Sequence, residues 1–336
     1  MNNNIDKILE VKNLRTYFDV DEGLVKAVDG VNLTIEKGKT LGIIGESGCG
    51  KSVTSHSILR LIPSPPGKLI EGSQILYYPE DGDAINLAEL DPKGDKMREI
   101  RGNEISMIFQ EPMTSFGPQH TIGNQIMEAI LIHNPDMSEE EARERTIGLL
   151  KQVGIPKAEK RVDSYPHEFS GGMRQRAMIA MALSCSPRLL IADEPTTALD
   201  VTIEAQILEL LQELQREREM SIMIITHNLA VVSEIADKIA VMYLGRRVEF
   251  AKTERIVNNP LHPYTRGLWR SIPKLEGPLE KLEPIKGMVP NPINRPAGCA
   301  FAPRCEEKIA GVCDMGGAPP CIEVEPDHFV SCHKYA

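Results

Sequence analysis

The stretch GIIGESGCGKS, residues 42–52, follows the pattern G-x-x-x-x-G-K-[ST] through Gly45, Gly50, Lys51 and Ser52. Glycines at this spacing let backbone N–H groups curl around phosphate oxygens, while the lysine reaches the terminal phosphates and the serine hydroxyl ligates Mg²⁺. The preceding TLGII is typical of a buried strand, and the following SVTSHSILRLI of a helix whose positive end faces the same anion. The stretch therefore predicts a site for a nucleotide triphosphate between a strand and a helix of an α/β fold.

Two adjacent carboxylates, Asp193 and Glu194, directly follow the aliphatic run RLLIA. Buried like charges are costly, so such a pair needs a cation, a proton or water close by. A strand that simply reaches the surface would also explain the pattern. If the run instead lies parallel to TLGII, both carboxylates reach the edge where α/β sheets bind ligands. The Mg²⁺ held by Ser52 and the nucleotide then satisfies Asp193, and Glu194 can act as general base on the attacking water.

His227 follows the run MSIMIIT, whose lack of polar alternation predicts a parallel strand covered on both faces. At the carboxyl end of that strand the imidazole would be aimed at the same nucleotide, where it can donate to the terminal phosphate and hold the water in line. Taken alone, a histidine at this place would be an ordinary surface or capping residue. The prediction of a catalytic His227 therefore depends on the phosphate loop.

The composition is that of a globular chain of 336 residues, of which 41% are hydrophobic and 26% charged. A formal net charge of −10 argues against a protein that neutralises a phosphate backbone, so no nucleic-acid partner is expected. The first residues, MNNNIDKILE, do not read as a secretory signal, and no apolar run is long enough to span a bilayer. We expect a cytosolic protein.

Local signals divide the chain into two parts. Alternating strands and turns fill the amino-terminal stretch, and SEEEARERTIGLLKQ at 138–152 predicts a helix that begins with a capping box. Another helix is expected just past Asp200, where aliphatic residues recur at helical spacing. Beyond about residue 252, closely spaced prolines break any long helix. We therefore expect a domain at 1–255 and a smaller, loop-rich appendage at 256–336.

The segment FSGGMRQR, residues 169–176, resembles the signature sequence of the ATP-binding cassette (ABC) family. The order of the motifs also matches: phosphate loop, Gln110, signature, LLIADEP, ALD and His227. The resemblance covers the whole chain and implies a P-loop NTPase (ABC ATPase) of the α/β class. It would contain a RecA-like parallel-sheet core, an antiparallel β subdomain, a helical subdomain at about 111–180 and the cysteine-containing appendage. By itself, the signature shows only a glycine turn and a basic helix start that suits an anion.

The resemblance implies further contacts with ATP and Mg²⁺. Phe18 would stack on adenine, and neighbouring Tyr17, which points the other way, is the second choice. Gln110, in IFQEPMTS, would contact the magnesium ion and the attacking water and pass their state to a membrane partner. The contacts implied within the phosphate loop are Gly45, Ser47, Gly48, Gly50, Lys51, Ser52 and Val53.

In the family, two such domains face each other head to tail and sandwich two ATP molecules. Ser170 and Gly172 would begin a helix whose N-terminus meets the terminal phosphate of a nucleotide on the opposite subunit, and Asp200 would lie across the interface. The chain carries one set of motifs. A second ABC ATPase subunit is therefore an expected partner, and the resemblance favours a paralogue over a second copy.

The tail narrows the resemblance to the ATPases of peptide permeases. NNPLHPYTRGLWRSIP at 258–273 and GCAFAPRC at 298–305 are similar to their C-terminal module, and the D-type subunit of dipeptide or oligopeptide importers matches best. This implies ATP-driven import through two transmembrane permease subunits, with the ATPase at the cytoplasmic face and an extracytoplasmic peptide-binding protein acting indirectly. SFGP at 115–118 departs from the branch, which usually has Leu-Asn before the proline. Sister systems that move nickel or glutathione share these motifs, so the cargo stays open.

Five of the seven cysteines lie between residues 299 and 332. Such a cluster in a reducing compartment favours metal binding over disulfides. The spacing fits neither a short zinc knuckle nor a ferredoxin run, which leaves zinc, an iron–sulfur cluster and unligated surface cysteines open. The family resemblance favours a [4Fe–4S] cluster with a structural role. Its pattern matches Cys299, Cys305, Cys313 and Cys332, with Cys321 as the substitute ligand.

A different class of function is a soluble ABC ATPase that acts on nucleic acid or ribosomes. Such chains generally carry two cassettes or a long inserted coiled coil, and this sequence has neither. A P-loop kinase would not need SGGMRQR. The sequence therefore favours the ATPase of a transporter.

Overall fold

The structure, a computed structural model, describes residues 7–110, 115–197, 200–271 and 284–336 and contains two sheets. The larger sheet has eight strands in the order β12-β13-β11-β10-β3-β9-β8-β7 within these ranges. The strands from β10 to β7 pair in parallel, whereas β11, β13 and β12 add antiparallel pairs at one edge. Their bounds are β3 (Thr40–Ile44), β7 (Ile105–Ile108), β8 (Leu189–Asp193), β9 (Ser221–Thr226), β10 (Lys238–Tyr243), β11 (Arg246–Lys252), β12 (Ile322–Glu325) and β13 (His328–Val330).

The parallel strands form the buried centre of the molecule. Every residue of β3, β8 and β9 is buried, as their continuous apolar runs predict for strands covered on both faces. Because β3, β9, β8 and β7 are neighbours, their carboxyl ends meet at one edge of the sheet. The predicted parallel-sheet core is confirmed, and with it the placement of LLIAD beside the strand before the phosphate loop.

The smaller sheet is the antiparallel β subdomain. Its strands run in the order β2-β1-β5-β6, with β4 paired to β1. A shared hydrophobic cluster joins this smaller sheet to one face of the parallel sheet and to α1 (Lys51–Ile58). The sequence predicts a longer helix here, but α1 ends at Ile58 and Arg60 adopts a φ of 55°. The strands are β1 (Lys7–Val20), β2 (Gly23–Glu36), β4 (Gly67–Leu69), β5 (Gln74–Tyr77) and β6 (Ile85–Asn86).

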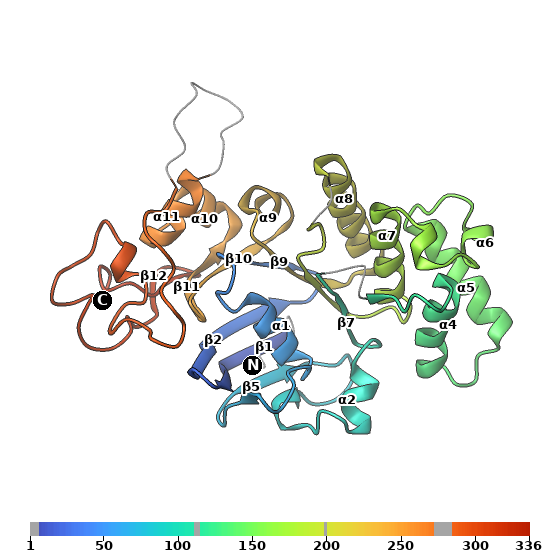
Figure 1. Cartoon of the computed structure of the whole chain (residues 1–336), viewed down its shortest axis with the longest axis horizontal. Helices are drawn as coiled ribbons and strands as arrows, with labels where there is room; N and C mark the ends of the chain where they lie inside the picture. The colour runs from blue at the N-terminus through green and yellow to red at the C-terminus, as the bar shows by residue number, and fades with distance from the viewer. Residues whose placement is uncertain (1–6, 111–114, 198–199, 272–283) are drawn as a thin grey trace.

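Helices form a lobe at one end of the molecule and the C-terminal residues form another lobe at the opposite end (Figure 1). The first lobe holds α4 (Ile122–His133), α5 (Glu139–Gln152), α6 (Ala158–Arg161) and α7 (Gly171–Ala182). The predicted capping box of α5 is present between Ser138 and Glu141. The remaining helices are α2 (Asp95–Ile100), α8 (Val201–Arg218), α9 (Leu229–Ile235), α10 (Thr253–Asn258) and α11 (Pro263–Arg270). None of the helices in the described ranges combines the length and apolar character that crossing a lipid bilayer demands.

A buried carboxylate, Glu249 of β11, attaches the C-terminal residues to the sheet. Its Oε1 accepts hydrogen bonds from the backbone N–H of Leu261 at 2.7 Å and lies 2.8 Å from Nε2 of His328, and its Oε2 accepts from the N–H of His262 at 2.9 Å. Strand β13 pairs with β11, so the C-terminal residues extend the same sheet. The domain limits 1–255 and 256–336 stay a prediction, and the contacts across residue 255 are extensive. We refer to residues 256–336, as far as they are described, as the C-terminal module.

Acidification should destabilise the C-terminal module, because its N-terminal helix begins at a buried neutral histidine. The Nδ1 of His262 accepts a hydrogen bond from the N–H of Tyr264, and burial lowers the pKa of His262 to about 4. The unfolded chain has an ordinary histidine pKa near 6.5 and binds the proton first, so stability present above that pH is lost as the pH falls toward 4. We expect the free energy of unfolding to fall by about 2 kcal/mol by about pH 5.

Trp269, the one tryptophan of the sequence, lies in α11, so its fluorescence during urea unfolding follows this module. The variant His262→Asn keeps a capping acceptor without the titration and should flatten the pH profile; parallel profiles would contradict the assignment.

Candidate nucleotide-binding and catalytic site

The phosphate loop joins the end of β3 to α1 and has a backbone that glycine alone fits. Gly45 has a φ of 152°, and a Cβ there would lie 2.2 Å from the carbonyl oxygen of Met242. Gly50 has a φ of 98°, and a Cβ there would lie 2.3 Å from the carbonyl oxygen of Ala27. Both positions are strained for any residue with a side chain. The loop is therefore shaped by its neighbours β10 and β2 as well as by its own glycines.

Lys51 lies buried under the loop, with 5% of its surface exposed. Its Nζ donates to the carbonyl oxygens of Gly45 at 2.8 Å and Glu46 at 3.2 Å, and lies 4.0 Å from Oε1 of Glu194. This ammonium group is held by carbonyl dipoles at the place where the motif predicts phosphate. A nucleotide can take over these contacts without a large movement of the side chain.

Asp193, at the end of β8, is buried beside the first turn of α1. Its Oδ1 accepts from Oγ of Ser52 at 3.0 Å and its Oδ2 from Oγ of Ser55 at 3.4 Å. Burial raises the pKa of Asp193, and no Lys or Arg among the described residues forms an ion pair with it. A nearly inaccessible carboxylate next to a serine hydroxyl, without a cationic partner, fits the oxygen ligands that Mg²⁺ prefers. The residues present therefore fit the expected magnesium ion.

Glu194 is the centre of the predicted catalytic group. Its Oε2 accepts hydrogen bonds from Nε2 of Gln110 at 3.3 Å and Oγ1 of Thr197 at 2.9 Å, and lies 3.3 Å from Nδ1 of His227. Its backbone has a φ of 47°, and its N–H donates to the carbonyl oxygen of Ile225 on β9. The structure thus brings Gln110, Glu194 and His227 together, because β7, β8 and β9 end side by side. Their chemical roles stay predictions.

Phe18 and Tyr17 are neighbours on β1, at an irregularity in its pairing with β2. The hydroxyl of Tyr17 donates to Oδ1 of Asp29 at 2.7 Å, whereas Phe18 pairs with Gly67 of β4 and has no polar group to satisfy. The stacking of Phe18 on adenine stays a prediction. In the loop itself, Ser47 and Gly48 are exposed and Val53 is half-buried on α1. Cys49 is buried and burial raises its pKa to about 11, so it is not a nucleophile.

The signature residues lie away from this group. Ser170 caps α7 by accepting from the N–H of Met173, and Asp200 caps α8 by accepting from the N–H of Ile203. Within the described ranges, no hydrogen bond or ion pair joins Ser170, Gly172 or Asp200 to the phosphate loop of the same chain. Ala198 and Leu199 of the ALD motif, and residues 111–114 of the predicted helical subdomain, lie outside the described residues.

Sequence reasoning missed two kinds of site residue. Thr197 bonds to the carboxylate of Glu194 three residues before it, and the turn sequence DEPTT carries a signal for such a local contact. Arg304 and Tyr264 contact Glu46 in the phosphate loop from more than 200 positions along the chain. No local sequence pattern indicates these two contacts.

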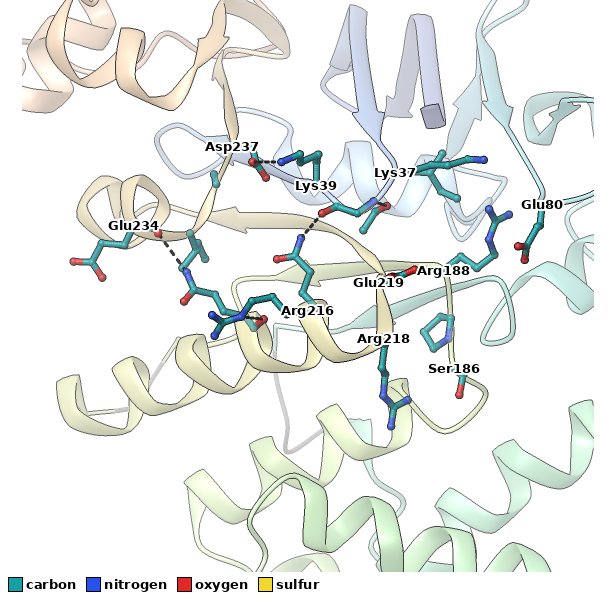
Figure 2. Close-up of a pocket in the computed structure, with 18 residues that line it drawn as sticks. Lys37, Lys39, Glu80, Ser186, Arg188, Arg216, Arg218, Glu219, Glu234 and Asp237 are labelled. Carbon is teal, nitrogen blue, oxygen red and sulfur yellow. Dashed lines mark hydrogen bonds and ion pairs between the residues drawn. The ribbon is translucent and has the colours of Figure 1, made fainter. Parts of the chain in front are cut away.

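A large hollow of about 950 Å³ lies at the opposite edge of the parallel sheet. Figure 2 shows it lined by Lys39 before β3, Arg188 before β8 and Asp237 before β10, with Lys39 paired to Asp237 at 3.1 Å. These residues precede the strands, whereas the phosphate loop follows one. The hollow contains none of the predicted site residues.

Four of the five clustered cysteines share one small cavity in the C-terminal module: Cys299, Cys305, Cys313 and Cys332. Cys321 is exposed outside it, where its Sγ lies 3.2 Å from Nη2 of Arg247. Within the described ranges, no group of three or more His, Cys, Asp or Glu side chains is arranged to hold a metal ion. The geometry thus brings the four predicted ligands to one place without forming a metal site, and the [4Fe–4S] cluster stays a prediction.

Comparisons with known proteins agree with this geometry. The family description "ABC transporter" matches residues 28–197, from β2 to the residues after Glu194. The chain belongs to the ABC transporter family. It is therefore an ABC ATPase, for which ATP with Mg²⁺ is the expected nucleotide. A second description, "Oligopeptide/dipeptide transporter, C-terminal region", matches residues 248–313 and includes three of the cavity cysteines.

Individual relatives of this ABC ATPase are similar over nearly its whole length. The oligopeptide transport ATP-binding protein AppD of Bacillus subtilis is 54% identical over 302 residues, which cover 90% of this chain and 89% of that protein. The dipeptide transport ATP-binding protein DppD of the same organism is 49% identical and covers 98% of this chain and 95% of that protein. Among solved structures, a dimer of the ATP-binding cassette MJ0796 bound to ADP and Pi has a TM-score of 0.63 and 28% identity, over 73% of this chain and 98% of that one.

Removing the ammonium group of Lys51 should abolish nucleotide binding. In Lys51→Ala the phosphates lose the main point charge that faces them, so we expect ATP affinity to fall at least about 100-fold. Equilibrium titration of the full chain with a fluorescent ATP analogue measures this directly. Lys39→Ala, which removes a lysine at the opposite edge of the sheet, is the matched control and should bind like the wild type. Retained affinity in Lys51→Ala would count against the phosphate-loop assignment.

Proposed function

We propose that this ABC ATPase powers the uptake of di- and oligopeptides through two separate transmembrane permease subunits. The observation that carries the proposal is the convergence of Gln110, Glu194 and His227 beside Lys51 in a chain whose relatives transport peptides. The ATPase docks peripherally on the permease at the cytoplasmic face of the membrane. An extracytoplasmic peptide-binding protein delivers the cargo to the same permease.

In this mechanism Glu194 takes a proton from the water that attacks the terminal phosphate. Hydrogen bonds from Gln110 and Thr197 fix the orientation of its carboxylate, which is what a general base needs. His227, 65% exposed, lies close enough to hold the same water and to donate to the phosphate. Ser52 and Asp193 would hold the magnesium ion, with Gln110 near it, and that ion supplies positive charge beside the phosphates.

The site is completed by a second ABC ATPase subunit. Ser170 and Gly172 start a helix of twelve residues, Gly171–Ala182, whose N-terminus suits a phosphate. Among the residues that the structure describes, no hydrogen bond or ion pair joins Ser170 or Gly172 to the nucleotide residues of their own chain. In a head-to-tail pair they would close over the nucleotide of the partner, with Asp200 at the interface. The partner is a paralogue in preference to a second copy.

We further propose that Cys299, Cys305, Cys313 and Cys332 hold a [4Fe–4S] cluster, with zinc as the alternative. Support comes from the shared cavity and from the exposed position of Cys321, which leaves these four as the set. Burial raises the pKa of Cys299 to about 11, so its thiolate would need a metal centre for stabilisation. A bound cluster would serve to fix a module that has little regular secondary structure.

Substituting the proposed base should separate binding from turnover. In Glu194→Gln we expect ATP binding to persist while hydrolysis falls by about 100-fold or more, because the amide cannot accept the proton. The closed dimer should accumulate. ATPase rates in the complete transporter and uptake of labelled dipeptide by cells lacking only this chain measure both consequences. Glu217→Gln, on the outer face of α8, is the control. Near wild-type hydrolysis in Glu194→Gln would contradict its role as the base. If returning this chain to the deficient cells restored uptake of nickel or glutathione and not of peptide, the proposed peptide cargo would be wrong.

The cysteine proposal predicts a coloured protein after anaerobic purification. Iron and acid-labile sulfide should be present in equal amounts, lost in Cys305→Ser and retained in Cys321→Ser. Elemental analysis together with visible absorption makes the measurement. A colourless protein with stoichiometric zinc, or one without metal, would contradict the cluster.

A further inference from the structure

One residue of the phosphate loop, Glu46, has all of its polar groups held by fixed partners. Its carbonyl oxygen accepts from Nζ of Lys51 at 3.2 Å. Its N–H donates to the hydroxyl of Tyr264 at 2.8 Å, and its carboxylate pairs with Nη1 and Nη2 of Arg304 at 2.6 and 3.0 Å. Tyr264 and Arg304 both belong to the C-terminal module. The loop that faces the phosphates is therefore fastened to the far end of the chain.

Both partners are themselves rigidly held. Tyr264 is fully buried, and its ring packs on Tyr243 with centroids 4.7 Å apart and on Phe301 with centroids 5.4 Å apart. The side chain of Arg304 is 4% exposed, and its Nε donates to the carbonyl oxygen of Lys286 at 3.1 Å. The hydrogen bonds to Glu46 raise the pKa of Arg304, so the guanidinium stays charged. Two short parallel bonds between a planar guanidinium and a carboxylate fix direction as well as distance.

We propose that Tyr264 and Arg304 are positioning residues of the nucleotide site, which hold the Gly45–Glu46 peptide and the Glu46 side chain so that the phosphate loop is preformed before ATP binds. The Glu46 N–H and the Gly45 carbonyl oxygen belong to one planar trans peptide and point in opposite directions. With the N–H engaged by Tyr264, the Gly45 carbonyl oxygen faces Lys51 and accepts from its Nζ at 2.8 Å. This holds the ammonium group under the loop, at the place where the motif predicts phosphate. The C-terminal module thereby sets ATP affinity in this chain. The inference rests on the proposed function only in that the loop binds ATP.

The cysteine cavity adjoins this contact. Arg304 directly precedes Cys305, and Phe301 both lines the cavity and packs on Tyr264. A shift in the segment 299–305 therefore moves Arg304, which reaches the loop. The connection between cavity and loop runs through the buried side chains of Phe301, Tyr264 and Arg304 to Glu46.

The sharpest test uses Tyr264→Phe, which removes one hydroxyl without changing charge or ring packing. We expect its ATP affinity, measured by titration of the full chain, to fall about 3–10-fold, as one lost hydrogen bond predicts. Tyr335→Phe is the matched control, because it removes a hydroxyl of the same module that donates to Leu261 and does not reach the loop. It should bind ATP like the wild type. Unchanged or higher affinity in Tyr264→Phe would overturn the inference.

Arg304→Met should weaken ATP binding at least about tenfold, and Arg304→Lys should restore part of the loss because it keeps the charge without the bidentate geometry. Arg266→Met breaks an ion pair with Glu307 inside the module and is the control. If the effect passes through Glu46, the double variant Glu46→Gln with Arg304→Met should lose no more affinity than the worse single variant. Additive losses would contradict the proposed route.

Two further readouts separate positioning from general damage. Hydrogen–deuterium exchange of residues 44–50 should increase in Tyr264→Phe without nucleotide, while the Trp269 unfolding transition stays at the wild-type urea concentration. If the Trp269 transition of Tyr264→Phe instead moves to a clearly lower urea concentration, the lost affinity is due to lost stability of the module, which would overturn the inference. If the wild-type chain itself bound no more ATP than Lys51→Ala does, that result would instead refute the proposed function.

Discussion

Parallel pairing of β3, β9, β8 and β7 is the constraint on which the site depends. Parallel strands end at the same edge, so residues that follow them meet even when they are distant in the sequence. The phosphate loop follows β3, His227 follows β9, Asp193 ends β8 and Glu194 comes directly after it, and Gln110 comes two residues after β7. A site for a bound phosphate and an attacking water needs groups from several directions. Four strand ends supply them on a buried and therefore rigid base.

The charged groups of the site suit a polyanion and a divalent cation bound together. Three carboxylates belong to the phosphate loop or to the strand end beside it, and each has a different environment. Arg304 neutralises Glu46, two serine hydroxyls solvate Asp193, and amide, hydroxyl and imidazole groups surround Glu194. Asp193 alone is buried without a strong donor, which is where a divalent cation would lower the energy most. The three acidic residues thus differ in their expected roles because their hydrogen-bond and ion-pair partners differ, and not because of their residue type.

The C-terminal module is integrated with the ATPase core at two points. The buried carboxylate of Glu249 is hydrogen-bonded to Leu261, His262 and His328. Glu46 is hydrogen-bonded to Tyr264 and Arg304. In both cases an acidic side chain of the core binds groups from the module. The cysteine cavity lies directly behind the second point. An appendage with few helices and strands is thus connected to the catalytic loop by well-ordered polar contacts.

The sequence by itself determined the local elements and the identity of most site residues. The glycine–lysine loop, the apolar runs of β3, β8 and β9 and the capping box of α5 are encoded within a few consecutive residues, where sterics and hydrogen bonding act on neighbours. The family resemblance ordered the same motifs into a nucleotide site. Tertiary structure alone decided that α1 stops at Ile58, that Cys321 lies apart from the other four cysteines, and that Arg304 and Tyr264 hold Glu46. The last two outcomes depend on contacts between residues 74 to 258 positions apart, and no periodicity or spacing in one sequence carries that information.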